Sequence, residues 1–282
     1  MKQLLVLLVL AQSFALTAFG RASEPERAAG ERLVLRLSGV DVAFRWIPPG
    51  RFTMGSPLEE DRRWGNEEEH IVEFTHGFWL AETETTRELW NAVNQSEQEL
   101  TADEARLPVA SVSWFQCRDF VNRLNSTRDA APAGYRFALP SEAQWEYSCR
   151  AGTTTPFHFG ASSNGQESNV QGTAPYGAQE KGPYLAHVAQ VGSYAPNAWG
   201  LYDMHGNLWE WTNDWFGGYD LSCEVALDPT GPEQGKDRVI RGGAFGSYPH
   251  RSRSAARSYA DQGECVGYIG VRLALLPENM EQ

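Results

Sequence analysis

The chain has 282 residues, a net charge of −12 and four cysteines. Such an acidic chain is a poor partner for nucleic acid or for an anionic membrane surface, because both carry charge of the same sign. Its length suits one large domain with a substantial hydrophobic core. The cysteines form no CxxC pair, which argues against a zinc site and against a thioredoxin-type redox motif. In an oxidising compartment one or two disulfides can form, and the sequence leaves open the pairing of Cys117, Cys149, Cys223 and Cys265.

Residues 1–22 have the layout of a secretory signal peptide. One basic residue precedes an apolar run, and small residues follow it, so cleavage is expected after Gly20 or Ala22. The alternative is a membrane anchor, but Gln12 and Ser13 interrupt the run, which is shorter than the roughly 20 residues that a bilayer span needs. We therefore expect a periplasmic or secreted protein with no membrane span after cleavage.

The segment that follows predicts a leader and then the start of a single domain. Residues 23–39 begin with a polar stretch and are expected to form a leader segment. The domain is predicted over residues 40–278. Its first part, residues 40–54, predicts short strands that break at Pro48-Pro49-Gly50.

Three predicted helices begin with the same capping device. In a capping box, a Ser or Thr side chain and a Glu or Gln three residues later satisfy free backbone amides of the first turn. The pairs are Thr85 with Glu88, Ser113 with Gln116, and Ser141 with Gln144.

The second of these helices has a clear apolar face. Its apolar residues recur at helical spacing and are expected to pack into the core, with Cys117 as a small buried residue rather than a nucleophile. They are Trp114, Cys117, Phe120, Val121 and Leu124.

Beyond Arg150 the chain changes character. Residues 151–200 and 212–236 are rich in Gly, Pro, Asn, Ser and Tyr and show little periodicity. Irregular backbone of this length needs partners for its polar groups. Bound metal, disulfides or extensive internal hydrogen bonding would each supply them.

Eight segments follow one another in a recognisable order. They are IPPGRFTMGS (47–56), FWLAETETTRELW (78–90), LPVASVSWFQC (107–117), YRFALPSEAQWEYSCRAGT (135–153), NAWGLYDMHGNLWEWTNDWF (197–216), RVIRGGAF (238–245), AARS (255–258) and GYIGVRLA (267–274). Together they resemble the formylglycine-generating enzyme/sulfatase-modifying factor family over nearly the whole chain after the leader. The resemblance implies an α+β fold, a compact domain of the C-type-lectin type with much irregular structure.

One loop carries a candidate metal site. Asp203 and Glu210 flank Gly206, and such a loop can aim side-chain and carbonyl oxygens at one point, as Ca²⁺ requires. From the spacing alone, a turn with solvated acids is an equal alternative. The resemblance implies a structural calcium held by the side chains of Asp203 and Glu210 and by the carbonyls of Gly206 and Leu208. Asn169 matches one half of the family's second calcium site, whose presence stays open.

The stretch RGGAFGSYPHRSRSAARS (241–258) holds no cysteine. Members of the family oxidise a substrate cysteine with dioxygen, using two thiols that bind copper(I), an ion that prefers soft ligands. Counted forward from the double glycine, the family's first thiol position is Ser247; counted back from Ala255, its second thiol position falls near Pro249. No copper and no cysteine-oxidase activity are therefore expected. Cys149 matches a disulfide position of the family whose partner here is Ser254.

Several arginines surround that stretch. Arg241, Arg257 and Arg272 belong to motifs common in the family and are expected to form structural ion pairs. Arg251 and Arg253 are candidates for binding an anionic substrate, because a guanidinium fork binds carboxylate or phosphate. Pairing with the chain's own acids is an equal alternative. Ser247 and Tyr248 are the other candidate substrate-binding residues.

Two side chains are candidate catalytic groups. Glu264 lies in a loop just before the last predicted strand, and a carboxylate in an enclosed aromatic site can transfer protons. His250 can do the same. A solvated surface Glu264 is the alternative. A nucleophilic pair of Cys265 and His250 is disfavoured, because exported cysteines usually oxidise.

Two functions follow as hypotheses. The first is oxidative tailoring of a peptide-like or small-molecule substrate without thiols, as in the exported relatives that mature the chromophore of pyoverdine, a peptide siderophore. The electron acceptor stays open, because the sequence shows neither a dinucleotide fingerprint nor an iron-binding histidine cluster. The second is a non-catalytic binding or accessory module on a lectin-like scaffold, for example with a periplasmic respiratory enzyme as protein partner. Fold alone does not decide between them.

Overall fold

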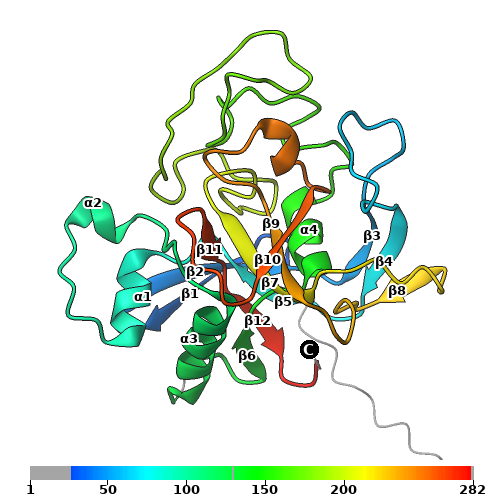
Figure 1. The fold of residues 1–282 in the computed structure, drawn as a ribbon. Coiled ribbons are helices and arrows are strands. Elements are labelled where there is room, and N and C mark those ends of the chain that lie inside the picture. Colours follow the sequence, from blue (N-terminus) through cyan, green and yellow to red (C-terminus); the bar gives the residue numbers. More distant parts are fainter. Residues whose placement is uncertain (1–26, 129, 281–282) are drawn as a thin grey trace, which may run out of the picture.

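A computed structural model describes residues 27–128 and 130–280 (Figure 1). The predicted signal peptide, residues 1–22, lies outside the described residues. Within the described part of the chain, no helix has the length and apolar character needed to cross a membrane.

The main sheet has five antiparallel strands and joins both ends of the domain. Its order is β1 (Arg32–Leu37), β2 (Val40–Ile47), β5 (Phe78–Ala81), β12 (Ala274–Pro277) and β6 (Tyr135–Ala138). The late strand β12 therefore lies between two early ones, where Ala274 pairs with Leu80 on one side and with Ala138 on the other.

Strand β1 corrects the expected leader over residues 23–39. Its sequence RLVLRL alternates, so that Leu33, Leu35 and Leu37 face the protein while the residues between them are exposed. This alternation is the pattern of an edge strand with one buried face. The polar residues just before β1 suggested a leader, so the sequence pattern did not predict this strand.

Two smaller sheets carry the rest of the domain. One has the order β10 (Arg257–Asp261), β9 (Asp237–Arg241), β7 (Trp209–Trp215) and β11 (Ile269–Val271). The other has the order β3 (Gly50–Met54), β4 (His70–Phe74) and β8 (Val225–Leu227). The break between β2 and β3 falls at Pro48-Pro49, as predicted.

Two of the three predicted capping boxes are confirmed. The helices are α1 (Arg87–Asn94), α2 (Ala102–Ala105), α3 (Trp114–Ser126), α4 (Glu142–Arg150) and the 3₁₀ turn η1 (Pro249–Ser252). Ser113 with Gln116 opens α3, and Ser141 with Gln144 opens α4. The cap of α1 is Thr86 rather than Thr85, because the backbone amide of Thr85 is held by the carbonyl of Val271. A box of Thr101 with Glu104, missed in the sequence, opens α2.

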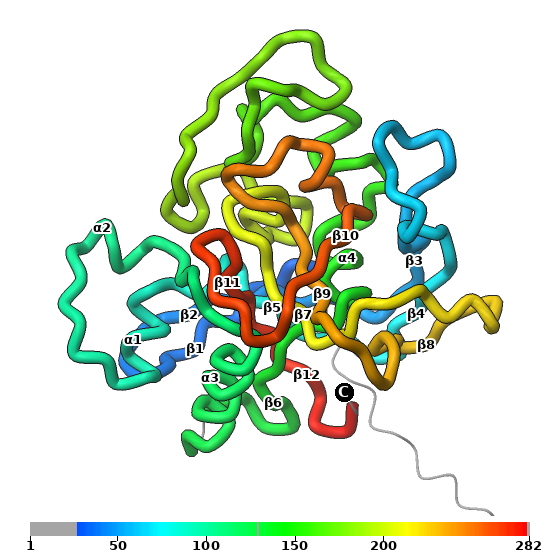
Figure 2. Tube along the Cα trace, in the orientation of Figure 1, coloured from blue at the N-terminus to red at the C-terminus, as the bar shows by residue number. Residues whose placement is uncertain are grey.

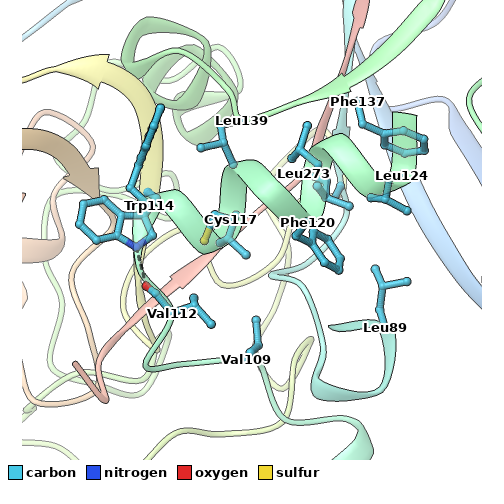
Figure 3. Close-up of a cluster of buried hydrophobic side chains, with 14 of the residues drawn as sticks. Leu89, Val109, Val112, Trp114, Cys117, Phe120, Leu124, Phe137, Leu139 and Leu273 are labelled. Carbon is cyan, nitrogen blue, oxygen red and sulfur yellow. Dashed lines mark hydrogen bonds between the residues drawn. The ribbon is translucent and has the colours of Figure 1, made fainter. Parts of the chain in front are cut away.

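The apolar face of α3 packs into the core as predicted. Figure 3 shows Cys117 and Phe120 on α3 in one cluster with Leu89, Val109 and Leu273. Cys117 is fully buried, and burial raises the pKa of its thiol well above the usual value. The residue is therefore a packing element and not a nucleophile.

The irregular second half is held by hydrogen bonds. Figure 2 shows much of it as long loops above the sheets. Asn197 is typical: its amide nitrogen donates to the carbonyl of Ser148 at 2.7 Å, and its oxygen accepts from the amides of Trp199 and Leu201. All four cysteines are free thiols. Internal hydrogen bonding thus supplies partners for this backbone.

Buried ion pairs join α4 to the second sheet, as predicted for Arg241 and Arg257. Arg257 binds the Glu142 carboxylate through Nε at 2.6 Å and Nη2 at 2.7 Å. Arg241 binds Glu146 and lies 3.6 Å from Glu142. Removing one partner of such a pair leaves an uncompensated buried charge, which strongly destabilises the folded protein.

Asp214 gives the stability of the protein a pH dependence. Burial, and then the nearby Glu142 carboxylate, raise the pKa of this carboxyl group from 3.8 to about 8. The folded chain keeps a proton that the unfolded chain has lost, so the free energy of unfolding falls as the pH rises from 6.5 to about 8. Burial lowers the pKa of His158 to about 4 and that of His205 to about 3. Because their pKa values lie below the ordinary histidine value of 6.5, these two histidines make the free energy of unfolding rise with pH, and only below pH 6.5.

Urea unfolding at pH 6.5 and at pH 8 measures this effect. We expect the wild type to lose up to about 1.4 kcal/mol per pH unit through Asp214. The Asp214→Asn variant should show a flatter profile, because the amide does not titrate. Equal slopes for the two proteins would contradict the assignment.

Candidate functional site

The chain turns sharply after β9 and brings η1 against it. Gly242 and Gly243 have φ angles of 96° and 77°. A Cβ on Gly243 would lie 2.0 Å from Ser252 Oγ, so only glycine allows this approach. Pro249 occupies the first turn of η1, where its missing N–H costs nothing.

Ser247 holds this turn together. Its Oγ accepts from the amide of Ala244 at 3.0 Å, and its own amide donates to the Ala244 carbonyl at 2.8 Å. Its carbonyl accepts from the amide of Gln171. The position expected for the first thiol therefore holds a hydroxyl that stabilises the turn.

Four side chains form a surface that we call the aromatic–cation face: Trp64, Tyr248, His250 and Arg251. The Tyr248 and His250 rings stack with centroids 6.0 Å apart. The Arg251 guanidinium lies over the Trp64 ring, 5.5 Å from its centroid. Tyr248 and Trp64 are 43% and 47% exposed, and Arg251 is exposed too. Among the described residues Arg251 forms no ion pair, so its charge is available to a ligand.

His250 is the titratable group of this face. It is partly buried, and burial lowers the pKa of its imidazole, with further lowering by Arg62, Arg251 and Arg253. A neutral imidazole beside a cation can accept a proton from a bound molecule. Of the two predicted catalytic groups, His250 is the one that lies on this face, and its catalytic role stays a prediction.

Arg253 is not a substrate-binding residue, contrary to expectation. It is fully buried, and all its donors are used. The guanidinium binds the Glu67 carboxylate at 2.8 and 2.9 Å, binds Glu60, and donates to the carbonyls of His250 and Arg62. It ties the loop between β3 and β4 to η1, so the alternative of internal ion pairing is correct.

Glu264 does not lie in an enclosed site, which corrects the second expectation. It is exposed, on a turn where its amide donates to the carbonyl of Asp261. This turn follows β10, whereas η1 precedes β10, so the strand separates Glu264 from His250. Cys265, next to it, contacts Gln116 on α3. Neither residue reaches the aromatic–cation face.

The structure brings Cys149 and Ser254 together, as the resemblance implied. Cys149 Sγ lies 3.7 Å from Ser254 Oγ and 3.6 Å from His205 Nε2. Burial raises the pKa of the Cys149 thiol to about 12. Nδ1 of His205 lies 2.6 Å from the carbonyl of Ser252, so the proton sits on Nδ1 and Nε2 accepts from the amide of His158. The pair is neutral and structural.

The candidate metal loop joins a buried charge cluster. Arg272 binds both oxygens of Glu210 at 2.7 to 3.1 Å, which confirms the ion pair predicted for Arg272. Trp145 Nε1 donates to Glu210 Oε2 at 2.7 Å. Asp203 Oδ2 accepts from the amide of Gly192. Glu84 lies nearby, and burial, with the charges of Asp203 and Glu210, raises its pKa well above the usual value.

These residues fit a calcium ion only in part. The donors are oxygens, which suits Ca²⁺. However, Glu210 already binds Arg272 and Trp145, and the described residues contain no group of three His, Cys, Asp or Glu side chains placed to hold a metal. A structural calcium bound by Asp203, Gly206, Leu208 and Glu210 stays a prediction. Melting temperatures measured with and without a chelator test this prediction. If the two temperatures are equal, the calcium prediction fails and Arg272 is the counter-charge of these carboxylates.

The loop between β3 and β4 contributes residues to the aromatic–cation face that the sequence did not indicate. Trp64 and Arg62 lie on this loop, about 190 positions before η1. The local signal was an aromatic residue beside two arginines in an otherwise acidic segment. Nothing in that pattern indicates which distant segment the loop contacts.

A match to a family model shows which family the chain belongs to. The sulfatase-modifying factor enzyme 1-like domain matches residues 42–276, most of the chain. The chain belongs to this family. The predicted resemblance and the α+β fold are thereby confirmed.

Curated relatives of this sulfatase-modifying factor-like domain include formylglycine-generating enzymes. The enzyme of Mus musculus is 39% identical over 144 residues, which cover 48% of this chain and 38% of the relative. That of Thermomonospora curvata is 34% identical over 199 residues, covering 67% of this chain and 61% of the relative. The chain thus spans less than two thirds of the length of these relatives. The serine/threonine-protein kinase pkn1 of Chlamydia caviae is 29% identical over 81% of this chain and 37% of the relative.

Solved structures share the fold of the domain. PvdO from Pseudomonas aeruginosa superposes with a TM-score of 0.70 at 26% identity, covering 89% of this chain and 99% of that one. Treponema denticola variable protein 1 also gives 0.70, at 21% identity and over 86% and 98% of the two chains. The second likeness shows the fold alone.

Proposed function

We propose that this chain is an exported, thiol-independent tailoring enzyme that oxidises a peptide-like substrate bound at the aromatic–cation face. The observation that carries the proposal is the composition of residues 244–254. They contain no cysteine, and they present a neutral His250 beside an unpaired Arg251. The segment has no residues for a reaction that needs two thiols. It does have residues that can bind a substrate and transfer a proton.

Each residue of the face has a role that its contacts support. The Arg251 fork can bind a carboxylate of the substrate. Trp64 and Tyr248 offer exposed ring faces for a planar group. His250 can remove a proton from the bound molecule. These roles favour a ligand that is anionic and aromatic. The substrate class expected from this chemistry is a precursor of a pyoverdine-type chromophore.

The electrons need an external acceptor. A two-electron oxidation removes two electrons and two protons from the substrate, and dioxygen, the oxidant of the family's reaction, accepts them to give hydrogen peroxide. His250 takes one of these two protons from the substrate and passes it on to the reduced oxygen, so that one hydrogen peroxide forms for each oxidised substrate. No step runs through copper or calcium. The similarity to PvdO over 99% of that chain supports a relative of this kind, and the pattern of residues 1–22 supports export.

A second candidate is a non-catalytic binding or accessory module that uses the same face. The position of Glu264 favours it, because this predicted catalytic carboxylate is exposed on the turn after β10 and does not lie beside His250. A protein partner such as a periplasmic respiratory enzyme would then take the place of a substrate.

Binding and oxygen uptake with a pyoverdine-type precursor separate the two. We expect Arg251→Met to weaken binding about tenfold, from the loss of a charge-assisted hydrogen bond. We expect His250→Gln to reduce oxygen uptake at least 100-fold with little change in affinity. Arg36→Met, on the exposed edge strand β1, is the control and should change neither.

Binding without oxygen uptake would support the accessory module. Affinity that is unchanged by Arg251→Met would overturn both candidates, because both place the ligand on this face. Melting temperatures of the variants exclude unfolding as the cause.

A further inference from the structure

Arg62 is a further cation beside the aromatic–cation face. It lies on the loop between β3 and β4, two positions before Trp64, and its side chain is 55% exposed. The proposed function assigns it no role. Its backbone conformation and its neighbours indicate that it binds part of the ligand.

The backbone of Arg62 has a left-handed conformation, with a φ angle of 54°. This conformation is unfavourable for a residue with a long side chain, and it persists only where the surroundings hold it. Two distant side chains hold this one. Arg253 Nη2 donates to the carbonyl of Arg62 at 3.2 Å, and the Tyr176 hydroxyl donates to the carbonyl of Asp61 at 3.0 Å. Residues held in strained conformations in this way cluster at binding sites and active sites.

The guanidinium of Arg253 also joins Arg62 to His250. Arg253 Nε donates to the carbonyl of His250 at 2.9 Å, while Nη2 of the same group holds the carbonyl of Arg62. One planar group therefore bridges the backbones of the two residues. Burial is the main cause of the lowered pKa of His250, and the charge of Arg62 comes next, ahead of that of Arg251. Arg62 and Arg251 thus place two positive charges near one imidazole.

The acids around Arg62 leave its charge available to a ligand. Glu60 and Glu67 both bind Arg253. Asp61 Oδ2 lies 3.7 Å from Arg62 Nε, and the side chain of Asp61 is 74% exposed. An ion pair between two exposed side chains contributes little free energy. Arg62 can therefore exchange this contact for an anionic group of a bound molecule.

We propose that Arg62 makes the aromatic–cation face selective for a planar ligand with two negatively charged groups, one bound by Arg62 and one by Arg251. The inference rests on the proposed function for the place of binding, and it adds the charge of the ligand. Trp64 and Tyr248 supply the exposed ring faces for the planar part. A ligand with a single charge would leave one of the two guanidinium groups without an anionic partner.

Benzoate and isophthalate test the number of charges, because they share one ring and carry one and two carboxylates. Affinities are measured by ligand-observed NMR at one pH and one ionic strength. The wild type should bind isophthalate at least about fivefold more tightly than benzoate. Arg62→Gly should weaken isophthalate binding about tenfold, from the loss of a charge-assisted hydrogen bond, and benzoate binding at most about twofold. Arg36→Met, on β1, is the control and should change neither affinity.

Glycine is the informative replacement, because it adopts a φ angle of 54° without strain. The melting temperature of Arg62→Gly should therefore not fall below that of the wild type. A weaker binding of isophthalate by a variant of unchanged or higher stability separates a binding role from a structural one.

A titration of His250 by NMR tests the placement of Arg62 without any ligand. The His250 signal is assigned by its absence in the His250→Gln variant. Arg62→Gly should raise the pKa of His250, because a nearby positive charge disfavours the imidazolium form. Arg36→Met should leave this pKa unchanged.

Four results would overturn the proposal: no saturable binding of isophthalate, equal wild-type affinities for benzoate and isophthalate, an equal effect of Arg62→Gly on both, or an unchanged pKa of His250 in Arg62→Gly. The proposed function is decided by a different measurement. If the pyoverdine-type precursor binds without oxygen uptake, the oxidation is rejected while the selection for two charges stands.

Discussion

Replacing Arg253 by methionine should lower the free energy of unfolding by about 3–5 kcal/mol. Methionine fills a similar volume but leaves Glu67, which is fully buried, and Glu60, whose side chain is 6% exposed, without their cation. Two buried carboxylates would then face each other across an apolar gap. In a domain of this size the loss corresponds to roughly 6–20 °C in melting temperature.

Arg251→Met is the matched control, since it removes the same kind of side chain two positions earlier. Arg251 is exposed, so the change should stay within about 0.5 kcal/mol. Urea unfolding of both variants measures the difference. Adding Glu67→Gln to Arg253→Met should restore part of the stability, because the two sites are in contact. A loss below about 1 kcal/mol in Arg253→Met would make Arg253 a candidate ligand-binding residue again.

Changing Ser254 to cysteine should create a disulfide with Cys149. The present contact of 3.7 Å joins Cys149 Sγ to Ser254 Oγ inside the core. A cross-link between positions 149 and 254 closes a loop of about 100 residues, which restricts the unfolded chain. The stabilisation expected is typically 2–4 kcal/mol, with an entropic ceiling near 5.

The measurement compares oxidised and reduced Ser254→Cys by unfolding and by thiol titration. The variant has five cysteines, so a single cross-link leaves three free thiols in denaturant. The double variant Cys149→Ser with Ser254→Cys keeps the new thiol without its partner and should show no dependence on reductant. Titration of five thiols after oxidation would contradict the expected pairing.

The local parts of the fold could be predicted from the sequence, and the long-range contacts could not. The caps of α3 and α4 depend on residues three positions apart, so Ser113 and Ser141 were assigned correctly. The cap of α1 was placed one residue early, because Thr85 pairs with distant Val271. Secondary structure that depends on such pairing is outside the reach of a local pattern.

The candidate site shows the same limit. Arg251 and Arg253 are chemically identical, and their roles differ because Glu60 and Glu67 approach one of them from about 190 positions away. Glu264 was predicted to belong to the site because it lies in a loop just before the last predicted strand. The length of β10 carries it to another part of the surface. Motif order identified the family, while side-chain availability required the three-dimensional arrangement.

The central place of β12 has a consequence for how the chain reaches its native state. Ala274 pairs with Leu80, 194 positions earlier (274 minus 80), so the main sheet stays split until the last strand arrives. Contacts of such long sequence separation slow folding and leave strand edges open in the meantime. During synthesis, the edges of β5 and β6 that β12 later covers are therefore open to other chains until the end of the domain has been made, and a chaperone that covers strands would act there.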